Sequence, residues 1–243
     1  MYHKPAGLAT QSAKVGQPDA VSELKKYLAG KASAENVGGM TEGAKGEQGR
    51  AKAGGAKTGT EPYLGIVHRL DQPVEGLLVF AKTKAAASHL TKQLEAGSLN
   101  KQYYATVCGK PEAKSGELVD YLLKEGNLAK VVPQGTPQAK KAVLQYRVAE
   151  SKVPECGAEI KSTQNVIRLD VHIDTGRFHQ IRVQLAHAGF PILGDMKYGT
   201  SESVEMSKEL GVRNVALFAY KLEFVHPVTG KHMEYKIEQK KPY

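Results

Sequence analysis

The sequence predicts an α+β protein with one large mixed, mostly antiparallel sheet and helices packed against it. Two observations support this fold class. Many short apolar runs, several of them with alternating polarity, are separated by turns that contain glycine or proline, which is typical of strand-rich proteins. Only a few segments space their apolar residues as an amphipathic helix does. The strands are therefore expected to form the framework, and the helices are expected to cover it.

Three helices are predicted. The first covers residues 20–28, where Asp19 is placed to cap the N-terminus and Gly30 is expected to end the helix. The second covers residues 84–96, and the third covers about 178–188. The apolar residues expected to face the core are Val21, Leu24 and Leu28 in the first helix and Ala85, Leu90 and Leu94 in the second.

The other apolar runs are interpreted as strands. Residues 76–81 form an uninterrupted apolar run that suits a buried strand. The last two runs are joined by a turn at residues 227–230 and are expected to pair as an antiparallel hairpin. In chain order the predicted strands cover residues 63–67, 76–81, 101–108, 118–123, 129–132, 142–149, 166–173, 215–224 and 233–237.

The chain is expected to form a single domain of residues 1–243. Its length amounts to one large domain or two small ones, and its polar motifs are spread over most of it. Residues from about 30 to 60 differ in composition: they are mostly glycine, alanine, lysine and glutamate, with almost no large apolar residue. This composition predicts a flexible, low-complexity insertion.

Composition also narrows the function. The 34 lysines and arginines exceed the 25 acidic residues by nine, which favours a polyanionic partner such as nucleic acid. No apolar stretch approaches the roughly 18 residues of a membrane span, and the first residues lack the apolar core of a signal peptide. Cys108 and Cys156 have no paired spacing, which fits the reducing cytoplasm. None of the eight histidines has the spacing of a catalytic zinc site, so no metal is expected.

The segment His68-Arg69-Leu70-Asp71 lies between an apolar strand and a turn that contains Pro73. A carboxylate at the end of a buried strand is held rigidly and is partly desolvated, which suits a nucleophile or a general base. An aspartate beside a turn also commonly bonds to its own backbone. This segment alone leaves both interpretations of Asp71 open.

A second polar segment surrounds the start of the third predicted helix. On a helix that begins at Phe178, Ile181 and Leu185 share the apolar arc, and Arg182 falls within it. An arginine beside the core is costly unless a carboxylate pairs with it, although its long stem can also reach the edge of the core. Pairing with Asp71 is the favoured interpretation, because it would keep that carboxylate ionised and fixed.

Three further polar residues, Arg177, His179 and Gln180, lie outside that arc, near the start of the helix. Exposed donors at this position suit a phosphate or a base edge. An ordinary polar helix face is the alternative.

The strand 101–108 carries two adjacent tyrosines. Lys101 and Tyr103 share one face of this strand, and Tyr104 points to the other. One tyrosine is expected in the core, and the other could stack on a nucleobase, since every base presents a flat face.

Together these segments resemble the RluA-type family of pseudouridine synthases. The resemblance extends from Lys4-Pro5-Ala6-Gly7 to beyond Tyr198, and it implies the pseudouridine synthase fold with a central RNA-binding cleft. Several ordered motifs at these separations are far more specific than any single one. The matching motifs are His68-Arg69-Leu70-Asp71, Gly76-Leu77-Leu78-Val79-Phe80-Ala81-Lys82, Lys101-Gln102-Tyr103, Thr175-Gly176-Arg177-Phe178-His179-Gln180-Ile181-Arg182 and Gly189-Phe190-Pro191-Ile192-Leu193-Gly194-Asp195.

The resemblance implies a role for individual positions. Asp71 matches the family's catalytic aspartate, and Arg182 matches the basic residue that ion-pairs with it. Tyr103 matches the active-site tyrosine that stacks on the target base and assists deprotonation at C5. Arg69 matches the arginine that fills the gap left by the flipped nucleotide. The other residues expected to bind RNA, because they lie in motifs that line the cleft, are Lys4, His68, Lys101, Arg177, His179 and Gln180.

The implied reaction breaks the N1–C1′ bond of a uridine, rotates the uracil and rejoins it through C5. Nothing is added or removed, so no cofactor is implied. The base must leave its stack to reach the carboxylate. The resemblance leaves open whether Asp71 attacks the sugar, attacks the base or removes a sugar proton. The implied partner is ribosomal or transfer RNA, and the protein is expected to act as a monomer in the cytoplasm.

Two other functions fit part of the pattern. A non-catalytic RNA-binding protein could retain the same fold, although the presence of Asp71, Tyr103 and Arg182 argues against a decayed site. A glycoside hydrolase needs two carboxylates flanking one bond, and Glu75 is the nearby second acid in the sequence.

The chain departs from the family pattern in three respects. Val74-Glu75 stand where the common pattern has Thr-Ser, so Glu75 is expected to alter a local hydrogen bond or an RNA contact. The chain begins almost at Lys4, where relatives usually have a strand that leads into the motif. No separate N-terminal RNA-binding module is expected, so substrate choice would depend on the catalytic domain and its loops, including residues 30–60.

Overall fold

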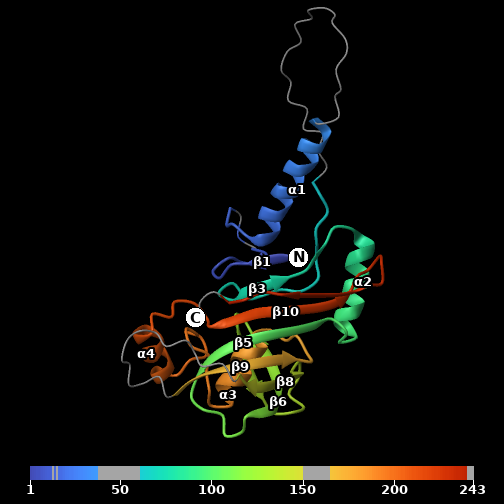
Figure 1. Ribbon diagram of the computed structural model, residues 1–243. Coiled ribbons are helices and arrows are strands. Elements are labelled where there is room, and N and C mark those ends of the chain that lie inside the picture. Colours follow the sequence, from blue (N-terminus) through green and yellow to red (C-terminus); the bar gives the residue numbers. More distant parts are fainter. Residues whose placement is uncertain (13, 15, 38–60, 150–164, 240–243) are drawn as a thin grey trace, which may run out of the picture.

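One large sheet with helices around it makes up the fold, which a computed structural model describes for residues 1–12, 14, 16–37, 61–149 and 165–239 (Figure 1). The strands are β1 (Tyr2–Lys4), β2 (Gly65–Ile66), β3 (Glu75–Leu78), β4 (Phe80–Ala81), β5 (Asn100–Cys108), β6 (Ser115–Glu125), β7 (Leu128–Val132), β8 (Lys140–Val148), β9 (Val166–Ile173), β10 (Leu217–Val225) and β11 (His232–Lys236).

The large sheet has nine strands in the order β1-β3-β10-β5-β9-β8-β6-β7, and β11 pairs with β10. Among these described strands β3 and β10 pair in parallel, and the other neighbours are antiparallel. The remaining strands, β2 and β4, form a small antiparallel sheet of their own. The predicted α+β class with a mixed, mostly antiparallel sheet is confirmed.

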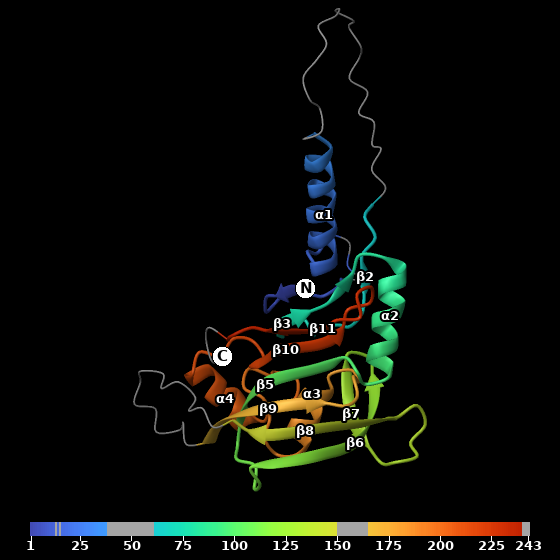
Figure 2. The same ribbon diagram turned by 45° about the vertical axis from the view of Figure 1, so that its right-hand side comes forward.

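The helices in the described part of the chain are α1 (Ala20–Val37), α2 (Lys84–Glu95), α3 (Gln180–His187) and α4 (Ser201–Glu209). α3 packs against β6, β7 and β8, and α2 packs against β2, β4 and β10. α1 projects away from the large sheet beyond β1, in both views of the molecule (Figures 1 and 2). The sheet and α3 therefore form the framework of the site.

The first helix is longer than predicted. Asp19 caps it as expected, because its Oδ1 accepts a hydrogen bond from the Ser22 N–H at 2.7 Å. Gly30 does not end it, and the helix continues to Val37 because the backbone at Gly30 keeps a helical conformation. The predicted insertion at 30–60 thus overlaps α1 up to residue 37, and its remainder lies outside the described residues.

The apolar run 76–81 forms two strands rather than the single strand predicted. Val79 separates β3 from β4, and its N–H donates to the buried ring of His68 at 3.3 Å instead of to a neighbouring strand. Gly76 allows β3 to approach β10 closely: its φ is +140°, and a Cβ there would lie 2.5 Å from the carbonyl oxygen of Ala219. This pairing anchors the chain a few residues after Asp71.

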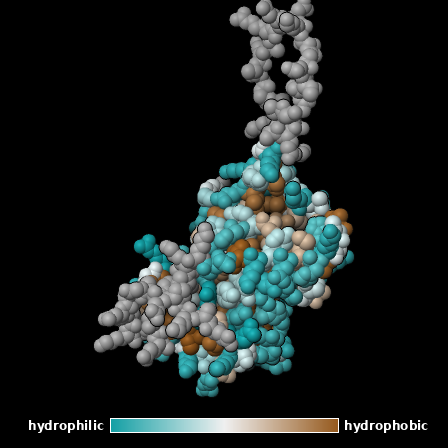
Figure 3. All heavy atoms as spheres, in the orientation of Figure 1, coloured by the Kyte–Doolittle hydropathy of each residue, from teal (hydrophilic) through white to brown (hydrophobic). Residues whose placement is uncertain are grey.

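The main hydrophobic core joins α3 to the sheet. Leu185 of α3 is fully buried in the same cluster as Leu144 of β8 and Leu169 of β9. On the face shown in Figure 3 the described surface is predominantly hydrophilic. No helix in the described part of the chain is long and apolar enough to cross a membrane.

Candidate active site

A cavity of about 820 Å³ lies where the loop after β2, the strand β5 and the start of α3 meet. Its volume is within the usual range for sites that bind small molecules. The structure brings nine of the predicted site residues to this cavity and leaves Lys4 outside it. The nine are His68, Arg69, Asp71, Lys101, Tyr103, Arg177, His179, Gln180 and Arg182.

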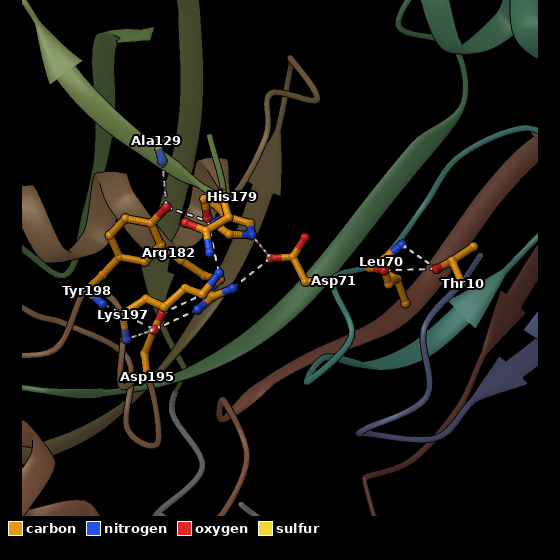
Figure 4. A network of polar contacts seen from close by, with 10 residues as sticks. Thr10, Leu70, Asp71, Ala129, His179, Arg182, Asp195, Lys197 and Tyr198 are labelled. Carbon is orange, nitrogen blue, oxygen red and sulfur yellow. Dashed lines mark hydrogen bonds and ion pairs between the residues drawn. The ribbon is translucent and has the colours of Figure 1, made fainter. Parts of the chain in front are cut away.

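Asp71 is presented by a loop that is fixed on both sides. Thr10 Oγ1 donates to the Leu70 carbonyl at 2.9 Å and accepts from the Leu70 N–H at 3.2 Å (Figure 4). On the other side the Asp71 carbonyl accepts from the Val74 N–H at 3.0 Å and closes a turn. The backbone that carries the carboxylate is therefore held in one position.

Lys4 has a different place from the one expected. Its side chain is completely buried, and its Nζ donates to the carbonyls of Pro5, Leu8 and Gln72 at 3.0, 2.7 and 3.1 Å. Burial lowers the pKa of Lys4 to about 8. This placement offers no contact to RNA, and the lysine instead ties the N-terminal segment to the loop of Asp71.

Arg182 connects Asp71 to a second aspartate. Its Nη1 donates to Asp71 Oδ2 at 3.0 Å, while its Nε and Nη2 each donate to Asp195 at 2.7 Å (Figure 4). Burial opposes the charge of Arg182, but the hydrogen bonds and charges of Asp195 and Asp71 outweigh it and raise its pKa. The ion pair that the helical spacing predicted between Arg182 and Asp71 is present.

Asp195 is a site residue that sequence reasoning missed. Its side chain is 1% exposed, and its Oδ1 also accepts from the backbone N–H groups of Lys197 and Tyr198 at 3.0 and 3.3 Å. A buried guanidinium offers donors along two edges, and Asp71 occupies one of them. A buried arginine at position 182 therefore needs a second acceptor besides Asp71, and this need could have pointed to Asp195.

The start of α3 differs from the prediction. The helix begins at Gln180, and His179 is its N-cap, with left-handed backbone angles (φ 53°, ψ 23°). Phe178 therefore does not join the apolar arc and is 38% exposed. His179, which was expected to be an exposed donor, is buried, and its Nε2 lies 3.6 Å from Asp71 Oδ2.

Gln180 is likewise buried instead of exposed. Its Oε1 accepts from Thr175 Oγ1 at 2.7 Å and from the Arg177 N–H at 3.0 Å, and its Nε2 donates to the Val143 carbonyl at 2.9 Å. Gln180 thus shapes the turn between β9 and α3 from inside.

Lys101 and Tyr103 share one face of β5, as predicted, and both line the cavity. Burial lowers the pKa of Lys101 to about 8, and its ammonium group makes no hydrogen bond or ion pair with another described residue. Burial, and secondarily the charge of Asp71, raises the pKa of Tyr103, so its hydroxyl stays protonated at neutral pH. Tyr104 points to the other face, where it stacks on Tyr220 with ring centroids 3.9 Å apart.

Arg69 and Arg177 lie on the exposed rim of the cavity. Arg69 donates to the side chain of Gln11 at 3.1 Å, and Arg177 donates through Nε to the Lys141 carbonyl at 3.0 Å. Neither is ion-paired with another described residue, so both guanidinium groups are accessible to an anionic ligand.

His68 is a buried, neutral histidine. Burial lowers its pKa to about 3, and the positive charge of Lys101 adds to this lowering. Its Nε2 accepts from the Val79 N–H, so in the neutral ring the hydrogen is on Nδ1. Nδ1 has no hydrogen-bond partner within the described residues.

We expect the His68 ring to make stability depend on pH. The unfolded chain takes up a proton near the ordinary pKa of 6.5, whereas the folded ring does so only near 3, so the free energy of unfolding falls as the pH drops through this window. A His68→Gln variant retains an acceptor and cannot titrate, so its free energy of unfolding should fall less steeply, by up to about 1.4 kcal/mol per pH unit. Urea unfolding at several pH values from 7 to 4 measures both slopes, and equal slopes would contradict the prediction.

The described residues contain no group of three or more histidine, cysteine or acidic side chains that could hold a metal ion. Glu75, which was expected to alter a local hydrogen bond or an RNA contact, does not line the cavity. Its Oε1 lies 2.8 Å from Nε2 of His3, at the pairing of β1 with β3. The Glu75 carboxylate thus contacts the edge of the sheet.

The chain is similar in sequence to known proteins. Residues 1–187 match the family model described as RNA pseudouridylate synthase. The ribosomal large subunit pseudouridine synthase D of Vibrio cholerae serotype O1 is 36% identical over 183 residues, which cover 72% of this chain and 52% of the relative. The synthase C of the same organism is 30% identical over 174 residues, which cover 71% of this chain and 50% of the relative. The chain thus spans about half the length of the curated relatives it matches.

Solved structures share the fold. Human RNA pseudouridylate synthase domain containing 4 superimposes with a TM-score of 0.66 at 21% identity, over 97% of this chain and 83% of that one. Human RNA pseudouridylate synthase domain containing 1 gives a TM-score of 0.59 at 22% identity, over 73% of this chain and 69% of that one. The fold implied by the sequence motifs is therefore confirmed.

Proposed function

Because the chain belongs to the RNA pseudouridylate synthase family, we propose that its cavity isomerises uridine in RNA to pseudouridine. The observation that carries this proposal is the ion pair of Asp71 with Arg182 at the wall of the cavity. The arginine is almost fully buried, while the Asp71 side chain is 26% exposed. A carboxylate that is held by a buried arginine and is partly exposed to the cavity can attack a ligand bound there or remove a proton from it.

Tyr103 is proposed as the residue that contacts the uracil. It lines the cavity together with Asp71, and its phenol stays protonated because burial raises its pKa. The flat ring suits stacking on a base, and a protonated hydroxyl can donate a hydrogen bond to it. A base must leave the RNA stack to reach such a site, and the exposed Arg69 at the rim suits the gap that the base leaves behind.

Ribosomal RNA of the large subunit is the proposed substrate, because the curated relatives that match this chain carry that substrate in their names. Transfer RNA is the alternative. The net charge of +9 favours either polyanion. Residues 1–243 are proposed to act as a single catalytic domain, since the site residues belong to the strands, their loops and α3. The protein is also proposed to act as a monomer in the cytoplasm.

Lys101 provides a test of RNA binding in the cavity. A buried ammonium group without a carboxylate partner is costly, and a phosphate group of the RNA would supply the missing charge. Lys101→Met should therefore weaken binding and reduce the slope of log affinity against log salt by about one. Lys208→Met removes an exposed lysine of α4 outside the cavity and is the matched control. Equal slopes for the two variants would argue against a phosphate at Lys101.

A non-catalytic RNA-binding protein with the same fold remains the rival function. The intact arrangement of Asp71, Arg182 and Tyr103 supports the enzyme. A glycoside hydrolase with Glu75 as its second acid is not supported, because Glu75 does not line the cavity.

Mapping of pseudouridine on cellular RNA tests the proposal. Carbodiimide treatment marks pseudouridine, and reverse transcription then stops at the marked site. Cells without this gene should lack at least one stop in large-subunit ribosomal RNA, and the gene for the wild-type protein should restore it, whereas the gene for the Asp71→Asn protein should not. If no stop in any cellular RNA depends on the gene, the proposed function is wrong.

A further inference from the structure

The two oxygens of the Asp71 carboxylate have unequal surroundings. Oδ2 accepts a hydrogen bond from Arg182 Nη1 at 3.0 Å and lies 3.6 Å from His179 Nε2. Oδ1 has no hydrogen-bond partner among the described residues. In Figure 4 Oδ2 faces Arg182 and His179, and the other oxygen points away from both. One oxygen is thus held by the protein, and the other is free.

A hydrogen-bond chain behind His179 defines the state of its ring. The Ala129 N–H donates to the Tyr198 hydroxyl oxygen at 2.8 Å, so the hydrogen of that hydroxyl is available for another acceptor. His179 Nδ1 lies 2.7 Å from the same oxygen and can accept this hydrogen. A neutral imidazole that accepts at Nδ1 carries its hydrogen on Nε2. Tyr198 therefore directs an N–H donor of His179 toward Asp71.

The charge of this ring is set by the groups around it. Burial lowers the pKa of His179 to about 4, and the positive charges of Arg182 and Lys197 add to this lowering, whereas Asp71 and Asp195 oppose it. At neutral pH the ring is therefore uncharged and can be a donor at Nε2 alone.

The backbone of His179 has an uncommon, left-handed conformation. Left-handed angles at a residue other than glycine are rare, although histidine adopts them more often than most. Such angles are strained, and they persist only where the surrounding structure enforces them. Phe178 stacks on the ring with centroids 3.8 Å apart, and Phe178 itself is 38% exposed. The strained residue is the one whose ring faces Asp71.

We propose that His179 is a positioning residue: Tyr198 holds it as the neutral Nε2–H form, and together with Arg182 it fixes Asp71 Oδ2, which leaves Oδ1 as the oxygen that meets the nucleotide. This inference rests on the proposed function. At 3.6 Å, Nε2 and Oδ2 are farther apart than a hydrogen bond, and catalytic contacts of this length commonly tighten when a substrate binds.

Two substitutions of His179 separate this role from a purely structural one. Asparagine tolerates left-handed angles better than glutamine, but its side chain reaches only the position of Nδ1. Glutamine reaches the position of Nε2 and can donate to Asp71. We expect His179→Asn to be the more stable variant and His179→Gln to be the more active one. The kcat of His179→Asn should be about 100-fold below that of the wild type, and the loss in His179→Gln should be much smaller. KM should change little in either variant.

The outcomes distinguish this inference from the proposed function. If the wild-type protein forms pseudouridine and His179→Asn equals or exceeds His179→Gln in kcat, the positioning role is wrong and the proposed function stands. If the wild-type protein forms none, the proposed function is wrong.

Nitrogen NMR of the histidine rings in the free protein is an independent measurement that needs no activity. It should show His179 protonated at Nε2 in the wild type and a mixture of both neutral forms in Tyr198→Phe. An Nδ1–H ring in the wild type would overturn the inference.

Discussion

Asp71→Asn should abolish pseudouridine formation, with a loss in kcat of about 10⁴-fold or more, as for other enzymes that lose a reacting side chain. The amide has nearly the shape of the carboxylate, and its oxygen can still accept the hydrogen bond that Arg182 donates to Oδ2. The fold and the affinity for RNA should therefore be preserved. The measurement is single-turnover formation of pseudouridine with purified protein and large-subunit ribosomal RNA, together with a binding titration at one fixed salt concentration.

Glu75→Gln is the matched control for this change. Glu75 lies four residues after Asp71, outside the cavity, and its carboxylate contacts His3. The variant should retain most of the activity. If Asp71→Asn keeps wild-type activity, or if Glu75→Gln loses as much as Asp71→Asn, the carboxylate of Asp71 is not the reacting group.

Arg182→Met should cause the largest loss of stability among the site variants. It leaves Asp195, whose side chain is 1% exposed, without the cation that accounts for two of its hydrogen bonds. Breaking a buried ion pair on one side costs about 3–5 kcal/mol. Activity should fall as well, because Asp71 loses its anchor. Urea unfolding measures the stability, and a loss below about 1 kcal/mol, the size typical of surface pairs, would contradict the buried pair.

A double variant keeps this prediction testable if the single variant does not fold. Arg182→Met with Asp195→Asn removes the unpaired charge while the amide oxygen can still accept from the N–H groups of Lys197 and Tyr198. It should recover much of the stability and none of the activity. Arg147→Met is the surface control, since Arg147 is 74% exposed and lies 3.6 Å from its partner Asp170. It should change stability by less than about 1 kcal/mol.

Much of the framework was predictable from periodicity. The apolar alternation placed β9 at residues 166–173, where the structure has it, and the hairpin of β10 with β11 was expected from the turn between them. The position of Arg182 within an apolar arc predicted its ion pair with Asp71, because a buried guanidinium requires a carboxylate. These predictions succeeded because each depended on local spacing and on one strong physical constraint.

The details that failed depend on contacts between distant segments. The left-handed backbone at His179 moved the helix start to Gln180 and exposed Phe178, and nothing in the local sequence requires that conformation. α4 was not predicted, because its buried positions include Ser203 and Ser207, small polar residues that give no apolar pattern. The buried hydroxyl of Ser207 is satisfied, because it accepts from the Gly194 N–H at 2.8 Å.

Lys4 and helix α2 also have surroundings that depend on distant segments and could not be predicted from the local sequence. Lys4 was grouped with the RNA-binding residues by its motif, and only the structure shows the backbone carbonyls that occupy its ammonium group. In α2 the predicted core residue Ala85 is exposed, and Gln93 is buried in its place. Gln93 is satisfied there by the backbone of Val225, with which it exchanges two hydrogen bonds of 2.7 Å.

Release of the hydrogen at C5 of uracil tests the central claim most directly. Joining uracil to the sugar through C5 must displace that hydrogen, so RNA labelled with tritium at C5 should lose label to water as pseudouridine forms. The wild-type protein should release tritium in equal amount to the pseudouridine formed, and Asp71→Asn should release none. Release that persists in Asp71→Asn, or the appearance of free uracil in place of pseudouridine, would contradict the assignment of Asp71 as the reacting carboxylate of an RNA isomerase.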